Sequence, residues 1–224
     1  MPSVYQLKSR FQRLLCPAVG LLVKWEVHPN TVTLFGGILS IAAGVLLWNS
    51  YSPFLLPAVL LLRMAVNAVD GMLARARQLT TPLGALLNET VDVVSDVVLY
   101  LPILKMTSIR AEWMILVISG AIITEMTGVL IVTLGGQRRY DGPMGKSDRA
   151  LVFGLLGVVL GFGMPTDRWI NEIAQGLLVL LGMTIWNRSV HGLRSISADP
   201  KASLGVGPAI GKSLELKDAF VMEK

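Results

Sequence analysis

Six apolar segments follow one another along this chain, and they constrain its fold more than any other feature. They lie at about residues 31–48, 53–73, 84–104, 113–134, 149–164 and 169–187. A helix needs roughly 20 mostly apolar residues to cross a bilayer. Only 16% of the residues are charged, whereas soluble domains carry about 25%. The sequence therefore predicts an all-α membrane protein with six transmembrane helices.

A cationic amphipathic segment precedes the first span. Its charged residues are Lys8, Arg10, Arg13 and Lys24. Basic residues among leucines are typical of a helix that lies on the membrane surface. We expect an interfacial helix over residues 1–24, a six-span domain over 25–190 and a loose cytoplasmic tail over 191–224. His28-Pro29 breaks the first helix, and Asn30 or Thr31 is expected to cap the next one.

The distribution of cationic residues predicts the orientation. Of the 20 Lys and Arg residues, 16 fall in segments on the same side as the N-terminus, three fall on the other side, and Arg63 lies within a span. Cationic residues collect in cytoplasmic loops, so both termini are expected in the cytoplasm, with the protein in the inner membrane if it is bacterial. This bias explains the net charge of +5. Nucleic-acid binding is not expected, because the sequence has no basic patch interleaved with aromatic residues. The single cysteine, Cys16, excludes an internal disulfide and a cysteine-based metal site.

Polar residues cluster in the second and third spans at regular spacing. Asn67 and Asp70 are three residues apart, so they share a helix face, while Asn88, Asp92 and Asp96 recur every four residues. Ionisable groups at membrane depth are costly and indicate a functional site. A short turn at 76–83 would bring the two helices face to face, and such oxygen ligands suit Mg²⁺ or Mn²⁺. The alternative is a buried polar network that only holds the two helices together.

The spacing of these residues resembles the signature of the CDP-alcohol phosphotransferases, D-x2-D-G-x2-A-R-x8-G-x3-D-x3-D. The matching residues are Asp70, Gly71, Ala74, Arg75, Gly84 and Asp92. The segments 29–33 and 145–147 also resemble the family, so the resemblance covers about residues 25–190. It implies a six-span, homodimeric enzyme that displaces CMP from a CDP-linked lipid or alcohol, with its active site at the cytoplasmic side.

The resemblance also implies roles for individual residues. Asp92 would be the catalytic base that takes a proton from the acceptor hydroxyl. The metal ligands would be Asp70, Asp92, Asn67 and Asn88. The substrate-binding residues would be Asn30, Thr33, Gly71, Ala74, Arg75, Thr81, Gly84 and Lys146.

The chain departs from the family signature at two acidic positions, which Asn67 and Asn88 occupy. At the four acidic positions of the signature, the family uses four carboxylates to hold two divalent ions, Mg²⁺ or Mn²⁺. An asparagine offers a carbonyl oxygen but no charge, so one ion in place of two is the alternative. Glu89 and Asp96 are placed to compensate partly. The departure leaves open both an active enzyme and a protein that binds a lipid nucleotide without chemistry.

Several functions remain compatible with the sequence. The favoured one is a phosphatidyltransferase of phospholipid biosynthesis that uses CDP-diacylglycerol and an alcohol acceptor, and a CDP-aminoalcohol donor is the variant. A small transporter would use Asp92, Asp96 and Glu125 as a proton relay, although Glu125 is also expected to pair with Arg63. A basic cluster would hold either a phosphorylated acceptor or lipid headgroups. Its members are Arg138, Arg139, Lys146 and Arg149.

Overall fold

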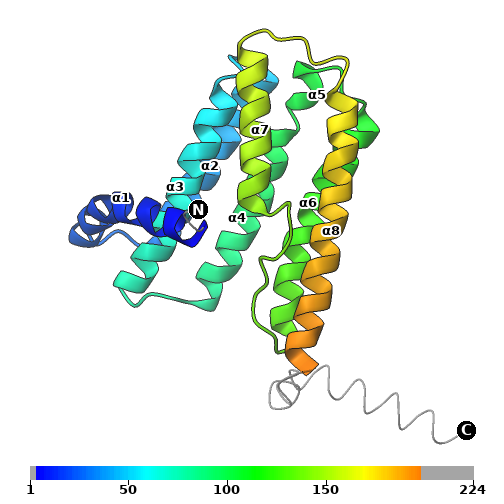
Figure 1. The fold of residues 1–224 in the computed structure, drawn as a ribbon. Coiled ribbons are helices and arrows are strands. Elements are labelled where there is room, and N and C mark those ends of the chain that lie inside the picture. Colours follow the sequence, from blue (N-terminus) through cyan, green and yellow to red (C-terminus); the bar gives the residue numbers. More distant parts are fainter. Residues whose placement is uncertain (1–3, 198–224) are drawn as a thin grey trace, which may run out of the picture. The chain divides into compact units, whose positions relative to one another are not determined.

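The computed structural model describes residues 4–197, which form helices and loops without a strand (Figure 1). The helices are α1 (Val4–Lys24), α2 (Pro29–Trp48), α3 (Leu55–Ala76), α4 (Pro82–Tyr100), α5 (Ile103–Met106), α6 (Ala111–Thr133), α7 (Lys146–Gly161) and α8 (Ile170–Ser197). Five of the six expected spans coincide with one long helix to within a few residues, whereas α8 continues to Ser197, beyond the end at residue 187 that was expected for the sixth span. The prediction of an all-α fold is confirmed for the described residues.

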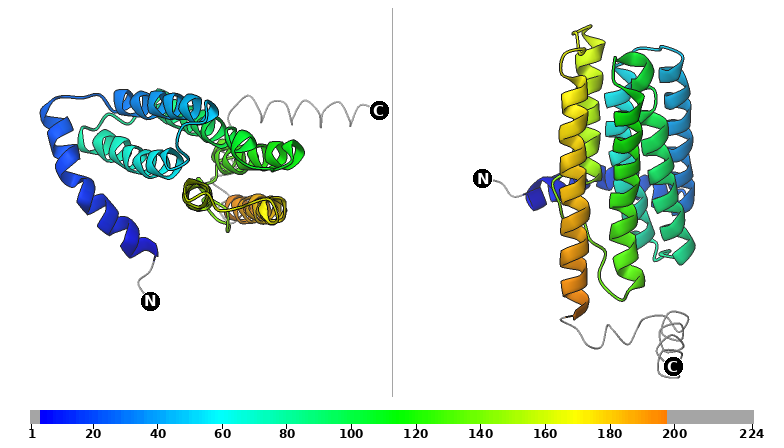
Figure 2. Two further views of the ribbon diagram at one scale, coloured as in Figure 1. Left: turned by 90° about the horizontal axis from the view of Figure 1, so that it is seen from above. Right: turned by 90° about the vertical axis from the view of Figure 1, so that its right-hand side faces the viewer.

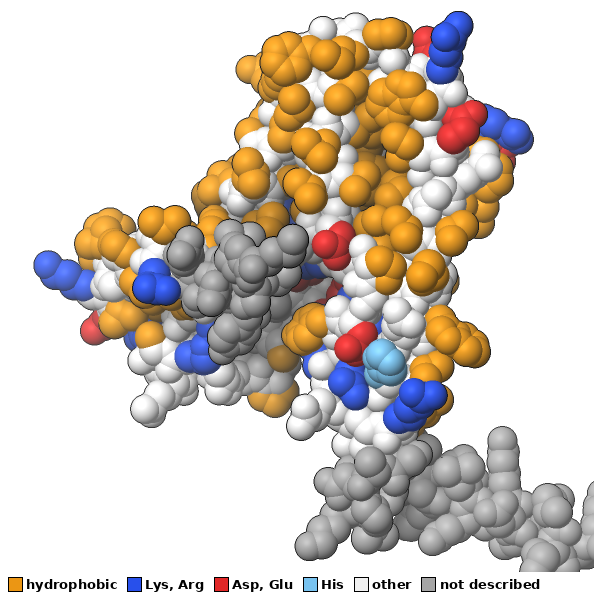
Figure 3. All heavy atoms as spheres, viewed as in Figure 1, with side chains coloured by type: hydrophobic (Ala, Val, Ile, Leu, Met, Phe, Trp, Pro, Cys, Tyr) orange, Lys and Arg blue, Asp and Glu red, His pale blue; other side chains and the backbone are white. Residues whose placement is uncertain are grey.

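Four of the described helices are long and apolar enough to cross a membrane: α2, α3, α6 and α8. The helices at the other two expected spans, α4 and α7, do not meet this criterion, each for its own reason. Helix α4 carries three acidic residues within 19, and α7 is only 16 residues long. Figure 3 shows hydrophobic side chains over much of the visible surface. The six-span count therefore stays a prediction at α4 and α7.

The first of two compact units comprises the chain up to Met114 together with Arg149–Asn171. Within it, α2 packs against both α3 and α4, and α1 packs against α3. Helix α1 lies across the direction of α2, α3 and α4 (Figure 2). Val19 of α1 is buried against Val69 and Leu73 of α3. The expected N-terminal helix is thus present, whereas its place on the membrane surface stays a prediction.

The N-cap of helix α2 lies two to three residues before the expected caps. Its N-cap is His28, whose Nδ1 accepts a hydrogen bond from the backbone N–H of Asn30 at 3.2 Å. Pro29 follows, and proline suits the first helical position because it has no N–H and a fixed φ. The prediction that Asn30 or Thr31 caps this helix is therefore wrong, and both residues lie within its first turn.

Glycines allow close contacts between helices of this unit. A Cβ atom on Gly44 of α2 would lie 2.6 Å from the backbone oxygen of Val98 in α4. A Cβ on Gly157 of α7 would lie 2.6 Å from the Pro57 ring in α3. No side chain fits at such distances, so these glycines serve close helix packing.

Among the described residues, the second unit comprises Ile115–Asp148 and Glu172–Ser197. It contains most of α6 and α8, joined to a loop that runs up to α7. Glu125 pairs with Arg188 at 3.5 Å and with Arg138 at 3.6 Å. The expected pairing of Glu125 with Arg63 is wrong, because cations of its own unit surround Glu125. Helix α8 continues to Ser197, so residues 191–197 are helical rather than a loose tail, and the rest of that tail lies outside the described residues.

Candidate functional site

The turn between α3 and α4 places both helix ends at one site. Leu79 donates its N–H to the Ala74 oxygen at 2.9 Å, and Gln78 adopts a left-handed φ of 55°. Thr81 then caps α4, since its Oγ1 accepts a hydrogen bond from the N–H of Gly84 at 3.0 Å. This turn confirms the prediction that the two polar helices are joined at 76–83.

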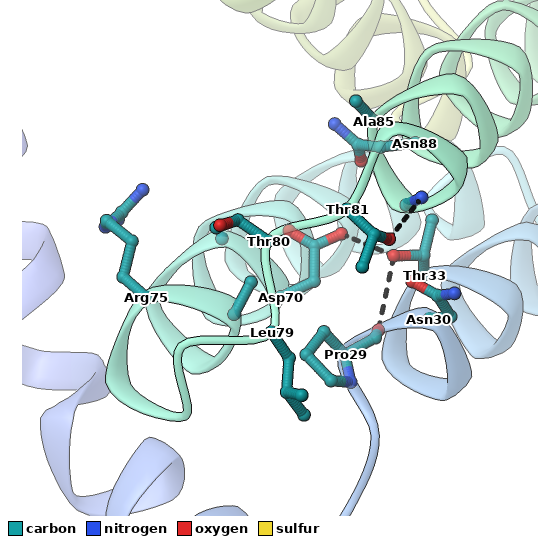
Figure 4. Close-up of a pocket in the computed structure, with 13 residues that line it drawn as sticks. Pro29, Asn30, Thr33, Asp70, Arg75, Leu79, Thr80, Thr81, Ala85 and Asn88 are labelled. Atoms are coloured by element: carbon teal, nitrogen blue, oxygen red, sulfur yellow. Dashed lines mark hydrogen bonds between the residues drawn. The ribbon is translucent and has the colours of Figure 1, made fainter.

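A pocket with a volume of about 200 Å³ opens beside this turn (Figure 4). It lies between the N-termini of α2 and α4 and the C-terminal turns of α3. It is lined by Pro29, Asn30, Thr33, Asp70, Gly71, Ala74, Arg75, Leu79, Thr80, Thr81, Gly84, Ala85 and Asn88. The pocket lies wholly within the first unit.

A buried carboxylate lies at the wall of this pocket. Thr33 donates its hydroxyl to Oδ2 of Asp70 at 2.9 Å, and the Thr33 hydroxyl also lies 3.3 Å from the Pro29 oxygen. A hydroxyl has one proton, and an ionised carboxylate is the stronger acceptor. Figure 4 shows the Asp70 carboxylate turned toward Thr33. The hydrogen bond fixes the orientation of the Asp70 carboxylate and joins α3 to α2.

Asn88 contributes an acceptor atom to the same pocket. Its Oδ1 is buried and finds no hydrogen-bond partner within the described chain. A buried polar atom without a partner costs about 1–3 kcal/mol, so Oδ1 of Asn88 is available to a bound water or ion. Asp70 and Asn88 thus line the pocket from facing helices with one carboxylate and one carbonyl oxygen. This donor set fits one hard divalent ion whose remaining ligands come from a bound phosphate or water.

The pocket is also suited to an anion. Helices α2 and α4 both begin at its rim, and a helix N-terminus carries a partial positive charge and unpaired N–H groups. Arg75, in the last turn of α3, adds a full positive charge. Gly71 and Ala74 leave the α3 backbone accessible. A Cβ on Gly84 would lie 3.0 Å from Asn30 Oδ1 and press into the polar rim.

Asp92 does not line the pocket and lies one helical turn farther along α4 than Asn88. Its Oδ1 accepts hydrogen bonds from Asn67 at 2.8 Å and from Arg63 at 3.2 Å. Arg63 also donates to Asp96 at 2.8 Å. Asp92 is therefore part of a buried charge network that joins α3 to α4.

The network also includes α7, because Arg149 donates to the second oxygen of Asp96 at 3.1 Å. Asp96 is thus shared by two guanidinium groups, which does not support the prediction that it compensates at a metal site. Sequence reasoning missed both arginines as partners. The available signal was the spacing of Arg63 four residues before Asn67, which places them on one face of α3.

The pocket brings together most of the residues that the sequence selected. These are Asn30, Thr33, Asp70, Gly71, Ala74, Arg75, Thr81, Gly84 and Asn88. Asn67 and Asp92 lie in the charge network, and Lys146 belongs to the second unit. Leu79, Thr80 and Ala85 were missed, although they occupy spacer positions of the same motif. Pro29, which also lines the pocket, belongs to the segment 29–33. No group of three or more His, Cys, Asp or Glu side chains that could hold a metal occurs in residues 4–197.

Comparison with known proteins gives a family match over most of the chain. The model of the CDP-alcohol phosphatidyltransferase family matches residues 26–186. The inner membrane protein YnbA of Escherichia coli is 45% identical over 189 residues, which cover 83% of this chain and 94% of that protein. The archaetidylinositol phosphate synthase of Aeropyrum pernix is 26% identical over 83% of this chain and 94% of its own length.

The fold is also similar to that of a solved enzyme. The phosphatidylinositol phosphate synthase of Mycobacterium tuberculosis, in a crystal structure with CDP-DAG bound, superimposes with a TM-score of 0.63 at 20% identity. The match covers 85% of this chain and 96% of that chain. A second structure of that enzyme, with manganese and citrate, gives a TM-score of 0.64 at 21% identity over 83% of this chain and 90% of that one.

Proposed function

Because the chain belongs to the CDP-alcohol phosphatidyltransferase family, we propose that it displaces CMP from a CDP-linked lipid with an alcohol acceptor. CDP-diacylglycerol is the proposed donor, since the structurally similar mycobacterial enzyme was solved with CDP-DAG bound. The observation that carries the proposal is the pocket, where two helix N-termini, Arg75, the buried Asp70 and Asn88 surround one space of about 200 Å³.

The pyrophosphate is the part of the donor that this pocket suits best. Its negative charges would meet the N-terminal ends of α2 and α4 and the guanidinium of Arg75. Gly71 and Ala74 let phosphate oxygens approach the α3 backbone. Asn30, Thr33, Thr81 and Gly84 would complete the contacts with CDP. The role of Lys146 in substrate binding stays a prediction from the family resemblance.

We assign one divalent ion, Mg²⁺ or Mn²⁺, to Asp70 and Asn88. The crystal structure of the mycobacterial enzyme with manganese supports the use of a divalent metal in this fold. When bound, the ion neutralises the pyrophosphate and stabilises the departing CMP. Thr33 holds the Asp70 carboxylate in the orientation needed for this role.

The chemical step is a displacement at the phosphorus that carries the lipid alcohol. Asp92 takes the proton from the acceptor hydroxyl. The oxygen of that hydroxyl forms the new P–O bond as the bond between phosphorus and CMP breaks. A base must lie within hydrogen-bond reach of its proton, and Arg63 and Asn67 hold the Asp92 carboxylate in a single orientation.

The protein is proposed to act as an integral membrane homodimer with both termini and the pocket in the cytoplasm. Residues 1–24 would lie on the membrane surface, 25–190 would form the six-span domain, and the tail would remain cytoplasmic. The membrane placement is supported by four apolar helices and by a relative named as an inner membrane protein. Chemical cross-linking in membranes tests the dimer.

A second candidate is a protein that binds the lipid nucleotide without turning it over. It is favoured by the engagement of Asp92 with Arg63 and Asn67, which would also suit a purely structural role. The discriminating experiment incubates purified protein with CDP-diacylglycerol, Mg²⁺ or Mn²⁺, and a panel of alcohols. The panel includes inositol phosphates, because two relatives are named as an archaetidylinositol phosphate synthase and a phosphatidylinositol phosphate synthase. Acceptor-dependent CMP release supports the enzyme, while donor binding without release with any acceptor supports the second candidate.

A further inference from the structure

The carboxylate of Asp92 is held by two donors from the facing helix. Asn67 Nδ2 lies 2.8 Å from Asp92 Oδ1, and Arg63 Nη2 lies 3.2 Å from the same atom. Arg63 and Asn67 are four residues apart, so they project from one face of α3. One oxygen of Asp92 therefore receives both a neutral and a charged hydrogen bond from residues of this chain.

The Arg63 side chain is a fixed part of the protein interior. It is only 4% exposed, and its other terminal nitrogen lies 2.8 Å from Asp96 Oδ1. A buried guanidinium is stable only when it is paired with carboxylates and hydrogen-bonded. Arg63 meets both conditions, because it bridges Asp92 and Asp96 along one side of α4. The positive charge beside Asp92 thus belongs to the chain itself and cannot be exchanged.

The orientation of Asn67 excludes it as a metal ligand in this arrangement. A carboxylate oxygen only accepts hydrogen bonds, so the amide of Asn67 presents its N–H to Asp92 and turns its carbonyl oxygen away. A metal ion shared by positions 67 and 92 would need oxygen atoms from both residues. The residues present therefore do not fit an ion between Asn67 and Asp92, although the pair Asp70–Asn88 fits one.

We propose that Arg63 and Asn67 take the place of a second divalent ion beside Asp92. Arg63 supplies the positive charge, Asn67 supplies the directed hydrogen bond, and together they position Asp92 without metal. The site then holds one exchangeable ion. This inference rests on the proposed function, in which Asp92 is the base, and it makes Arg63 a positioning residue.

The test counts bound metal rather than turnover. The full-length protein in lipid nanodiscs is titrated with Mn²⁺, and free Mn²⁺ is measured by electron paramagnetic resonance. Wild type is expected to bind one Mn²⁺ per chain. The double variant Arg63→Gln/Asn67→Asp removes the internal cation and restores an oxygen ligand, so it is expected to bind two. Arg63→Lys keeps the charge and should stay at one.

The matched control is Arg77→Gln, which makes the same change beyond the end of α3, where Arg77 bonds the Val27 oxygen. It should leave the count at one. Two Mn²⁺ ions in wild type would overturn the inference even if the double variant fails to fold, and so would a folded double variant that binds one. The metal count is independent of the CMP-release assay of the proposed function. If wild type binds one ion but releases no CMP with any acceptor in that assay, the proposed function is contradicted and this inference is not.

Discussion

At the scale of single residues, Asp92 carries the chemistry that separates an enzyme from a binding protein. Asp92→Asn keeps the size of the side chain and removes the charge that accepts a proton. We expect CMP release to fall about 10²- to 10⁴-fold, the usual contribution of a general base. Binding of CDP-diacylglycerol should persist, because Asp92 does not line the pocket. The loss of turnover is checked by quantifying CMP release. The retained binding of CDP-diacylglycerol is checked separately by a filter assay.

The control for Asp92 is Asp167→Asn, the same change in an exposed loop where Asp167 accepts a hydrogen bond from Ser108. Turnover of this variant should match wild type. Near-normal turnover in Asp92→Asn would show that Asp92 is not the base.

Asn88 permits a second prediction at this scale. Its buried Oδ1 has no partner among the described residues and faces a pocket that also contains Asp70. Asn88→Asp adds a negative charge to a proposed ligand and should lower the Mn²⁺ concentration for half-maximal binding, while Asn88→Leu removes the oxygen and should raise it. A Mn²⁺ titration monitored by electron paramagnetic resonance checks both. Equal affinities in all three proteins would remove Asn88 from the metal site.

At the scale of helices, α2 and α4 pack closely against each other. There is no room for a side chain at Gly44 of α2, because a Cβ atom there would lie 2.6 Å from the backbone oxygen of Val98 in α4. Gly44→Leu should destabilise the protein by about 1–3 kcal/mol, the usual cost of overpacking. Gly20→Ala is the control, because nothing lies within 4 Å of a Cβ there. Thermal unfolding should show a lower Tm for Gly44→Leu only, and equal values would contradict the close α2–α4 contact.

Helix positions and the motif residues could be predicted from sequence because apolar length and i, i+4 spacing are local properties. The pocket residues Asp70 and Gly84 come from two helices joined by a short turn, so their proximity also followed from sequence. The partners of Arg63 could not be predicted in this way. Periodicity shows which face a side chain occupies, whereas the choice between Asp92, Asp96 and Glu125 depends on how the helices pack.

At the scale of the whole molecule, the distribution of charge predicts the topology. The pocket residue Arg75 should face the cytoplasm, and Ser108, in the loop before α6, should face the other side. In a Cys16→Ser background, Arg75→Cys should react with an impermeant thiol reagent only after cells are permeabilised. Ser108→Cys is the control and should react in intact cells. Labelling of Arg75→Cys from outside would contradict the six-span arrangement.

The most direct test of the central claim follows both products of one reaction. Purified protein receives CDP-diacylglycerol, a divalent ion and the acceptor that the panel selects. Liquid chromatography with mass spectrometry then quantifies CMP and the new lipid phosphodiester. Displacement by the acceptor predicts that the two products form in a one-to-one ratio, and that both are lost in Asp92→Asn. CMP without the phosphodiester, or neither product despite bound donor, would contradict the assignment of this pocket as a phosphatidyltransferase site.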